Sequence, residues 1–131
     1  MLVKARFRIV GFKSFVEGVA LVDTGATFTI LDKSVADTIG VRYIDKKIRI
    51  AVADGHEIEG EFAIVDKLAI EDEELPHVYV VVTELSDKVK EVLRRAGLCD
   101  YLIIGVTTLE LLQLVPDPTT DKLQKTAALL I

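Results

Sequence analysis

The sequence predicts a mainly β domain with one or two short helices. Half of its 131 residues are apolar, only 6% are aromatic, and Trp is absent. A composition rich in Val, Ile and Leu suits a compact β interior better than a disordered chain. Residues 2–10 carry the clearest strand pattern, because apolar side chains alternate there with Lys and Arg. The length suits one domain, so residues 1–131 are expected to fold as a single unit.

Apolar segments and turn residues place the next elements. Residues 18–22 are almost wholly apolar and predict a buried strand. Residues 28–31 predict a return strand. Asp32 can then cap a short helix over residues 33–39, which Gly40 would end.

A long β-hairpin is predicted between residues 47 and 65. Asp54 and Gly55 lie between two alternating segments, and an Asp-Gly pair in that place is a strong hairpin signal. Pro76 and the acidic residues before it suit an exposed turn between two further strands. These strands and the acidic stretch are expected at residues 67–70, 77–83 and 71–74.

The second half of the chain predicts a helix, a strand and another helix. Ser86 can cap a short amphipathic helix, since apolar residues follow it at helical spacing. Residues 101–104 are apolar and end at Gly105, which predicts a buried strand. Thr107 or Thr108 can then cap a second helix.

Composition excludes several classes of function. The net charge is −5 and the basic residues are scattered, so nucleic acid is not an expected partner. The single cysteine, Cys99, cannot form an intrachain disulfide and has no neighbours at metal-ligand spacing, so neither a metal nor a cofactor is expected. There is no signal-peptide core and no run of membrane-spanning length. The sequence therefore predicts a soluble, cytoplasmic protein without a membrane partner.

Asp23 is the candidate catalytic residue. It follows an apolar strand and precedes Thr24 and Gly25, which places a carboxylate at the edge of a dry region and allows close backbone approach at the glycine. Taken alone, the tripeptide is equally compatible with an ordinary loop in which the Asp side chain caps a turn.

Three landmarks in order make the chain resemble the retropepsin family of aspartic proteases. They are the segment Ala20-Leu21-Val22-Asp23-Thr24-Gly25-Ala26-Thr27, the glycine-tipped hairpin, and Leu102-Ile103-Ile104-Gly105 leading into a helix that contains Leu109. The resemblance implies a closed acid-protease β-barrel with a flap hairpin. It also implies an active site assembled from two identical chains, since this chain has only one Asp-Thr-Gly.

The resemblance assigns roles to the residues around Asp23. Two copies of Asp23 would share one proton, so that one activates a water and the other polarises the scissile carbonyl of a polypeptide. Thr24 would cross-link the two active-site loops, Gly25 would contact substrate through its backbone, and Ala26 would line the cleft. The expected activity is that of an aspartic endopeptidase favouring acidic pH.

The hairpin tip and the chain ends also receive roles from the resemblance. Asp54, Gly55 and His56 would form the flap that closes over the peptide, with His56 exposed rather than catalytic. Residues 2–7 and the apolar residues 127–131 are candidates for the homodimer interface. Val106 departs from the family pattern, which often has a basic or polar residue after the second glycine.

Two other functions fit parts of the sequence. A catalytically silent dimeric domain of the same fold could bind extended peptides without cutting them, with Asp23 kept as a structural hydrogen-bond centre. A phosphoryl-transfer enzyme would explain an Asp-Thr-Gly-Ala-Thr loop, but the chain has no phosphate-binding lysine loop and no strand–helix alternation.

Overall fold

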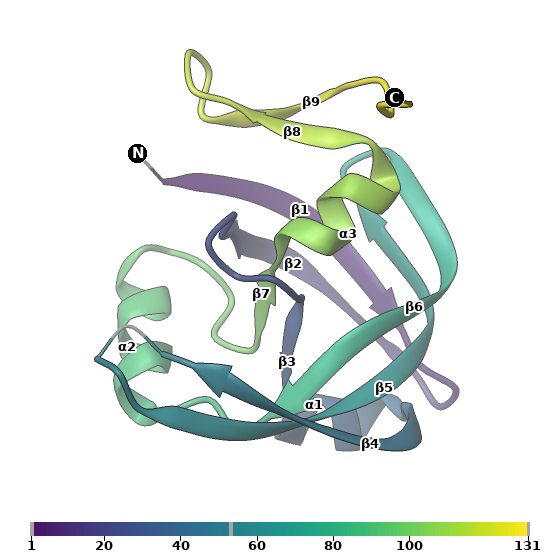
Figure 1. Ribbon diagram of the computed structural model, residues 1–131, viewed down its shortest axis with the longest axis vertical. Coiled ribbons are helices and arrows are strands. Elements are labelled where there is room, and N and C mark those ends of the chain that lie inside the picture. The colour runs from purple at the N-terminus through teal and green to yellow at the C-terminus, as the bar shows by residue number, and fades with distance from the viewer. Residues whose placement is uncertain (1, 53, 131) are drawn as a thin grey trace.

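The computed structural model describes residues 2–52 and 54–130. Strands dominate these residues, and three short helices lie between them (Figure 1). The mainly β fold class is confirmed, with three short helices rather than one or two. In chain order the elements are β1 (Val3–Val10), β2 (Phe15–Val22), β3 (Ile30–Asp32), α1 (Lys33–Ile39), β4 (Arg42–Ala51), β5 (Glu57–Ile70), β6 (Glu73–Thr83), α2 (Asp87–Arg95), β7 (Leu102–Ile104), α3 (Val106–Leu112), β8 (Leu114–Asp117) and β9 (Lys122–Lys125).

Six strands close into a barrel. The order β1-β2-β7-β3-β6-β5 returns to the start because β5 also pairs with β1, from Phe7 opposite Ile70 to Val10 opposite Lys67. Closure removes the free edges that an open sheet would expose. Strand β4 lies outside the ring and pairs only with β5. The expected closed β-barrel is therefore confirmed.

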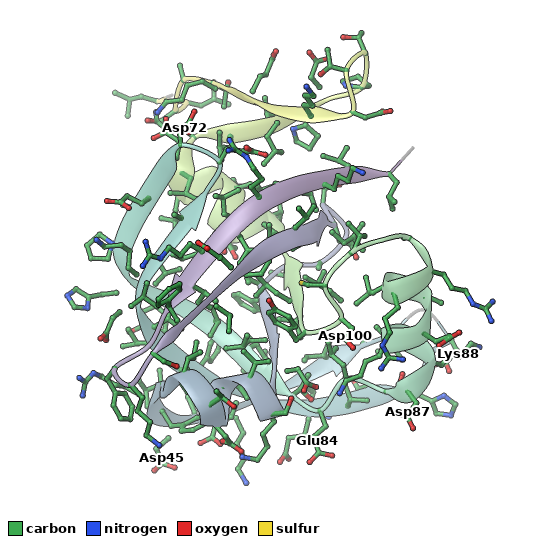
Figure 2. The ribbon with its side chains drawn as sticks, turned by 180° about the vertical axis from the view of Figure 1, so that it is seen from behind. Asp45, Asp72, Glu84, Asp87, Lys88 and Asp100 are labelled. Atoms are coloured by element: carbon green, nitrogen blue, oxygen red, sulfur yellow. The ribbon has the colours of Figure 1, made fainter. Side chains whose placement is uncertain are left out.

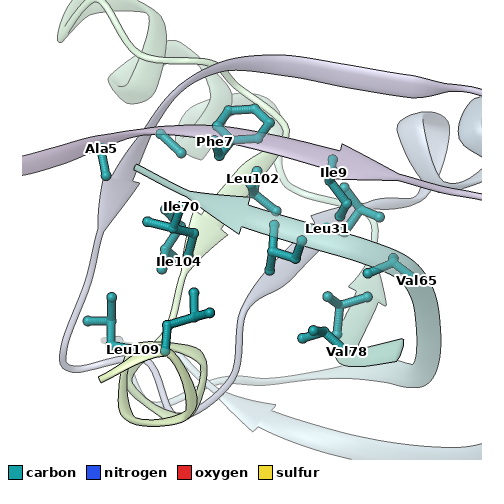
Figure 3. Packing of buried hydrophobic residues seen from close by; sticks show 14 of the residues in the cluster. Ala5, Phe7, Ile9, Leu31, Val65, Ile70, Val78, Leu102, Ile104 and Leu109 are labelled. Atoms are coloured by element: carbon teal, nitrogen blue, oxygen red, sulfur yellow. The ribbon is translucent and has the colours of Figure 1, made fainter. Parts of the chain in front are cut away.

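In β1, apolar and charged residues alternate, and the apolar ones face the barrel interior. Val3, Ala5, Phe7 and Ile9 are buried, while the residues between them are exposed. Leu31, Val65, Ile70, Leu102, Ile104 and Leu109 meet them from other elements of the same core (Figure 3). Burying such side chains contributes about 1.5 to 3 kcal/mol each before the loss of chain entropy is counted.

The β5–β6 hairpin differs from the sequence expectation. β5 runs unbroken to Ile70, and the turn is confined to Glu71 and Asp72, of which Asp72 is labelled in Figure 2. Glu73 and Glu74 already belong to β6, so the acidic stretch is not wholly a turn. Pro76 also lies within β6. On the side of β6 that faces β3, the two strands pair only at Val81–Thr83, so no hydrogen bond to β3 is needed at Pro76. A proline, which has no amide hydrogen to donate, is tolerated at such a position.

The C-terminal part of the chain extends beyond the barrel. β8 and β9 form a separate two-stranded sheet beyond α3 in Figure 1. Leu129 and Leu130 are 91% and 99% exposed, so this chain leaves its apolar end uncovered. Among the described residues, no helix is long and apolar enough to cross a membrane.

A buried carboxylate ties α1 and α2 to the barrel. Asp32 is 3% exposed, caps α1 through Ser34 and accepts a hydrogen bond of 2.8 Å from the Leu85 amide. Lys90 of α2 lies 3.4 Å from the same carboxylate. Burial alone would raise the pKa of Asp32, but the hydrogen bonds from Ser34 and Leu85 and the charge of Lys90 lower it overall. The sequence predicted the cap at Asp32 but not its link to α2.

Replacing Asp32 by Asn is expected to lower the free energy of unfolding by about 2 kcal/mol at neutral pH, because Ser34 and Lys90 lose the charge that they contact. Urea unfolding measures the loss. Asp37→Asn is the matched control, since Asp37 lies in α1, the helix that Asp32 caps. Its ion pair with Lys33 is exposed and contributes less than about 1 kcal/mol.

The contribution of Asp32 should depend on pH. Its folded pKa is below the unfolded value of about 3.9, so its stabilisation is complete above that pH and is lost as the pH falls through the folded pKa. The difference in stability between the wild type and Asp32→Asn should therefore shrink in acid. A difference that stays constant from neutral to strongly acidic pH would contradict this assignment.

Candidate active site

Asp23 lies directly after β2, in a loop held by its own side chain and by β7. Its amide donates a 2.9 Å hydrogen bond to the carbonyl of Ile104, and its carbonyl accepts one of 3.0 Å from Ala26. The carboxylate oxygen Oδ1 accepts a hydrogen bond of 2.9 Å from the Gly25 amide. Asp23 and Ala26 are partly buried, whereas Thr24 and Gly25 are exposed. The carboxylate is thus fixed at the rim of the barrel and open on one side.

A second loop supports the first. β2 and β7 are parallel, so both carry the chain to the same rim of the barrel, where β7 ends at Ile104, directly before Gly105. The Val106 amide donates to the carbonyl of Ala26 at 2.8 Å, and the Thr107 amide donates to the carbonyl of Thr27 at 3.1 Å. The first turn of α3 therefore fixes the loop that contains Asp23.

Gly105 makes the closest contact between the two loops. A Cβ atom at this position would lie 2.3 Å from the carbonyl carbon of Phe28 and 2.8 Å from the Thr29 nitrogen, both of them backbone atoms. The Gly105 amide donates a 3.1 Å hydrogen bond to Thr29 Oγ1, which lies 2.6 Å from Thr108 Oγ1. Both hydroxyls are buried. Only glycine permits this approach.

The hairpin formed by β4 and β5 has one apolar and one charged face. Directly opposed residues share a face, so Ile50 and Ile58 lie together, and Gly60 and Phe62 continue that face along β5. The other face carries exposed ion pairs, such as Arg49 with Glu57 at 3.6 Å. The predicted hairpin is confirmed, although Ala53 lies outside the described residues.

The apolar face of this hairpin lies on the same side as the Asp23 loop. The rings of Phe28, in the loop, and Phe62, on β5, meet edge to face with centroids 5.1 Å apart. The contact between Phe28 and Phe62 therefore joins the Asp23 loop to the apolar face of the hairpin, which Phe62 shares with Ile50 and Ile58.

Comparison with known proteins identifies the family. A family model described as aspartyl protease matches residues 6–108, which include the Asp23 loop, the hairpin and Gly105. The chain belongs to the retropepsin-like aspartyl protease family.

The chain is also similar to solved structures. The retroviral protease-like domain of Ddi1 from Leishmania major matches with a TM-score of 0.54 and 21% identity, covering 95% of this chain and 88% of that one. A retropepsin-like aspartic protease from Rickettsia conorii matches with a TM-score of 0.48 and 17% identity, covering 90% and 89%. No curated protein gives a significant match.

The hairpin tip is held by its acidic residue. Asp54 Oδ1 accepts a 2.9 Å hydrogen bond from the His56 amide and lies 3.0 Å from His56 Nδ1. The hydrogen bonds from the backbone and side chain of His56 lower the pKa of Asp54. Gly55 has φ of +91°, and no atom of the described residues lies within 4 Å of its Cβ position, which suits a turn residue in solvent. His56 is exposed.

The threonines after Gly105 do not cap α3. Gly105 itself is the N-cap and makes no side-chain capping bond, so the expectation of a cap at Thr107 or Thr108 was wrong. Thr107 Oγ1 instead donates to the carbonyl of Thr27 at 2.6 Å, and Thr108 contacts Thr29. In a sequence, a hydroxyl residue at the start of a helix indicates an N-cap. Here the two hydroxyls instead connect the start of α3 to the loop that contains Asp23.

Asp23 does not line either of two surface hollows of the single chain. One, of about 290 Å³, lies beside Arg6, Arg8 and Glu17, and the other, of about 300 Å³, lies beside Lys47 and Glu59.

Replacing Gly105 by Ala is expected to lower the free energy of unfolding by about 3 kcal/mol, because the added methyl overlaps backbone atoms that cannot move aside. Gly18→Ala is the control, since a Cβ there would meet Phe7 at an ordinary 3.4 Å. Thermal unfolding of both variants makes the comparison. Equal stability of the two would contradict the close contact.

Proposed function

We propose that residues 1–131 form one half of a homodimeric aspartic endopeptidase, with Asp23 as the catalytic carboxylate. The observation that carries the proposal is the position of Asp23: its backbone is fixed by Ile104 and Ala26, yet its side chain lies at an open rim of the barrel. The family to which the chain belongs supports a hydrolase. A single carboxylate cannot supply both the acid and the base, so a second chain is required.

The proposed reaction needs one proton shared between two copies of Asp23. The ionised carboxylate takes a proton from a water, whose oxygen then bonds to the scissile carbonyl carbon. Asp23 of the partner subunit, which is protonated, donates its proton to the carbonyl oxygen. The carbon–nitrogen bond then breaks, and the leaving nitrogen takes the proton that the first carboxylate took from the water. One hydroxyl of the tetrahedral intermediate gives its proton to the partner subunit's Asp23, which restores the starting protonation of both carboxyl groups. Two carboxyl groups that share one proton do not both ionise readily, so the activity of such a pair should be highest in acid.

The residues near Asp23 have subordinate roles in the proposal. Thr24 is exposed in the single chain and would contact the second active-site loop. Gly25 would present its backbone to an extended substrate, and Ala26 would line the cleft. Asp54, Gly55 and His56 would form the tip of a flap, with the Asp54–His56 contact fixing its turn and the apolar hairpin face covering the peptide.

Replacing Asp23 by Asn should abolish cleavage of unfolded polypeptides in acid, with a loss of at least about a hundredfold, because Asn cannot take or give the proton. Mass spectrometry of new chain ends is the measurement. Asp72→Asn is the matched control, since Asp72 lies in the exposed β5–β6 turn (Figure 2) and should leave the rate unchanged.

The two variants separate the possible outcomes. Cleavage that survives Asp23→Asn would contradict the proposal. A folded dimer that binds unfolded peptides without cutting them would instead support the catalytically silent domain. The fold of each variant is checked by circular dichroism.

A further inference from the structure

Three aromatic side chains extend from the Asp23 loop across the barrel wall. Phe28 and Phe62 meet with ring centroids 5.1 Å apart and planes at 84°. Phe62 and Tyr79, on β6, meet at 6.2 Å and 83°. Both contacts are edge to face, the geometry that aromatic rings prefer. The aromatic row, defined as Phe28, Phe62 and Tyr79, therefore begins at the candidate active site and leads away from it.

The barrel core does not account for the aromatic row. None of its three residues belongs to the buried core cluster. Ala63 and Val80 are completely buried, so their neighbours Phe62 and Tyr79 lie on the opposite, outward face of β5 and β6. Phe28 and Phe62 are partly buried, whereas Tyr79 is 53% exposed. An apolar surface this close to the site is thus open to a ligand.

The start of the row is rigidly placed relative to Asp23. The carbonyl carbon of Phe28 packs against Gly105, and its neighbour Thr27 accepts hydrogen bonds from Thr107. The row also continues the apolar hairpin face, since Phe62 shares that face with Ile58. A side chain held this firmly beside a catalytic loop can discriminate between ligands.

We propose that the aromatic row is a specificity subsite that binds one apolar, preferably aromatic, side chain of the polypeptide substrate at a fixed position away from the cut bond. The inference rests on the proposed peptidase function. An extended peptide points alternate side chains to one face, so a chain lying across Asp23 can place one of them on the row.

The first test is the cleavage profile of a peptide mixture. Tyr79→Ala should lower kcat/KM about tenfold for peptides with an aromatic residue at the preferred position and leave peptides with Ala there unchanged. Phe15→Ala is the matched control, because Phe15 is 47% exposed but lies on β2 beneath Arg8. An identical profile for the wild type, Tyr79→Ala and Phe15→Ala would overturn the proposal.

The second test does not depend on catalysis. The chain has no Trp, so fluorescence of a Trp-containing peptide reports only the peptide. Binding to Asp23→Asn protein should shift the Trp emission to the blue, and Tyr79→Ala added to that protein should weaken binding about tenfold. Equal affinity with and without Tyr79 would overturn the subsite. If the wild type fails to cleave, the peptidase proposal falls, and this binding result still decides the subsite.

A third measurement distinguishes a substrate from a second copy of the chain. Sedimentation should give the same dimer affinity for the wild type and Tyr79→Ala. A weakened dimer would overturn the proposal, because the aromatic row would then be covered by the partner chain.

Discussion

The structure of the site depends on one close backbone contact, between Gly105 and the residues Phe28 and Thr29. The parallel strands β2 and β7 end at the same rim, and this contact brings the loops that follow them together. Away from water, Thr29 Oγ1 accepts a hydrogen bond from the Gly105 amide and forms a second one with Thr108 Oγ1, so these buried polar groups all have partners. This contact helps to fix the backbone of the loop that contains Asp23 and Phe28.

The same arrangement is consistent with our proposal that one chain forms only half of an active site. The loop contacts fix the backbone of Asp23 but leave its side chain at an open rim, and the chain contains a single Asp-Thr-Gly. Ion pairs occupy one face of the β4–β5 hairpin, while the apolar face continues to Phe62 beside the loop. A peptide and a second chain would cover surfaces that this chain leaves open, including Leu129 and Leu130.

Local patterns in the sequence predicted local structure well. The alternation in β1, the cap at Asp32 and the Asp-Gly turn each depend on neighbouring residues, and the structure has all three. Contacts between distant residues were not predictable in this way. The β1–β5 pairing that closes the barrel, the Lys90 contact with Asp32 and the use of Thr108 as a loop contact leave no periodic signal. Phe62 fits an ordinary outward position of a strand, so its contact with Phe28 was also missed.

Mixing active and inactive chains tests the central claim most directly. Wild-type protein is titrated with Asp23→Asn protein under conditions where dimers exchange, and cleavage per wild-type chain is measured. If each site needs Asp23 from both chains, activity per wild-type chain should fall to about half at equal amounts and continue falling with excess variant, by mass action. Activity that does not change with added variant would contradict a shared site and assign the whole reaction to one chain.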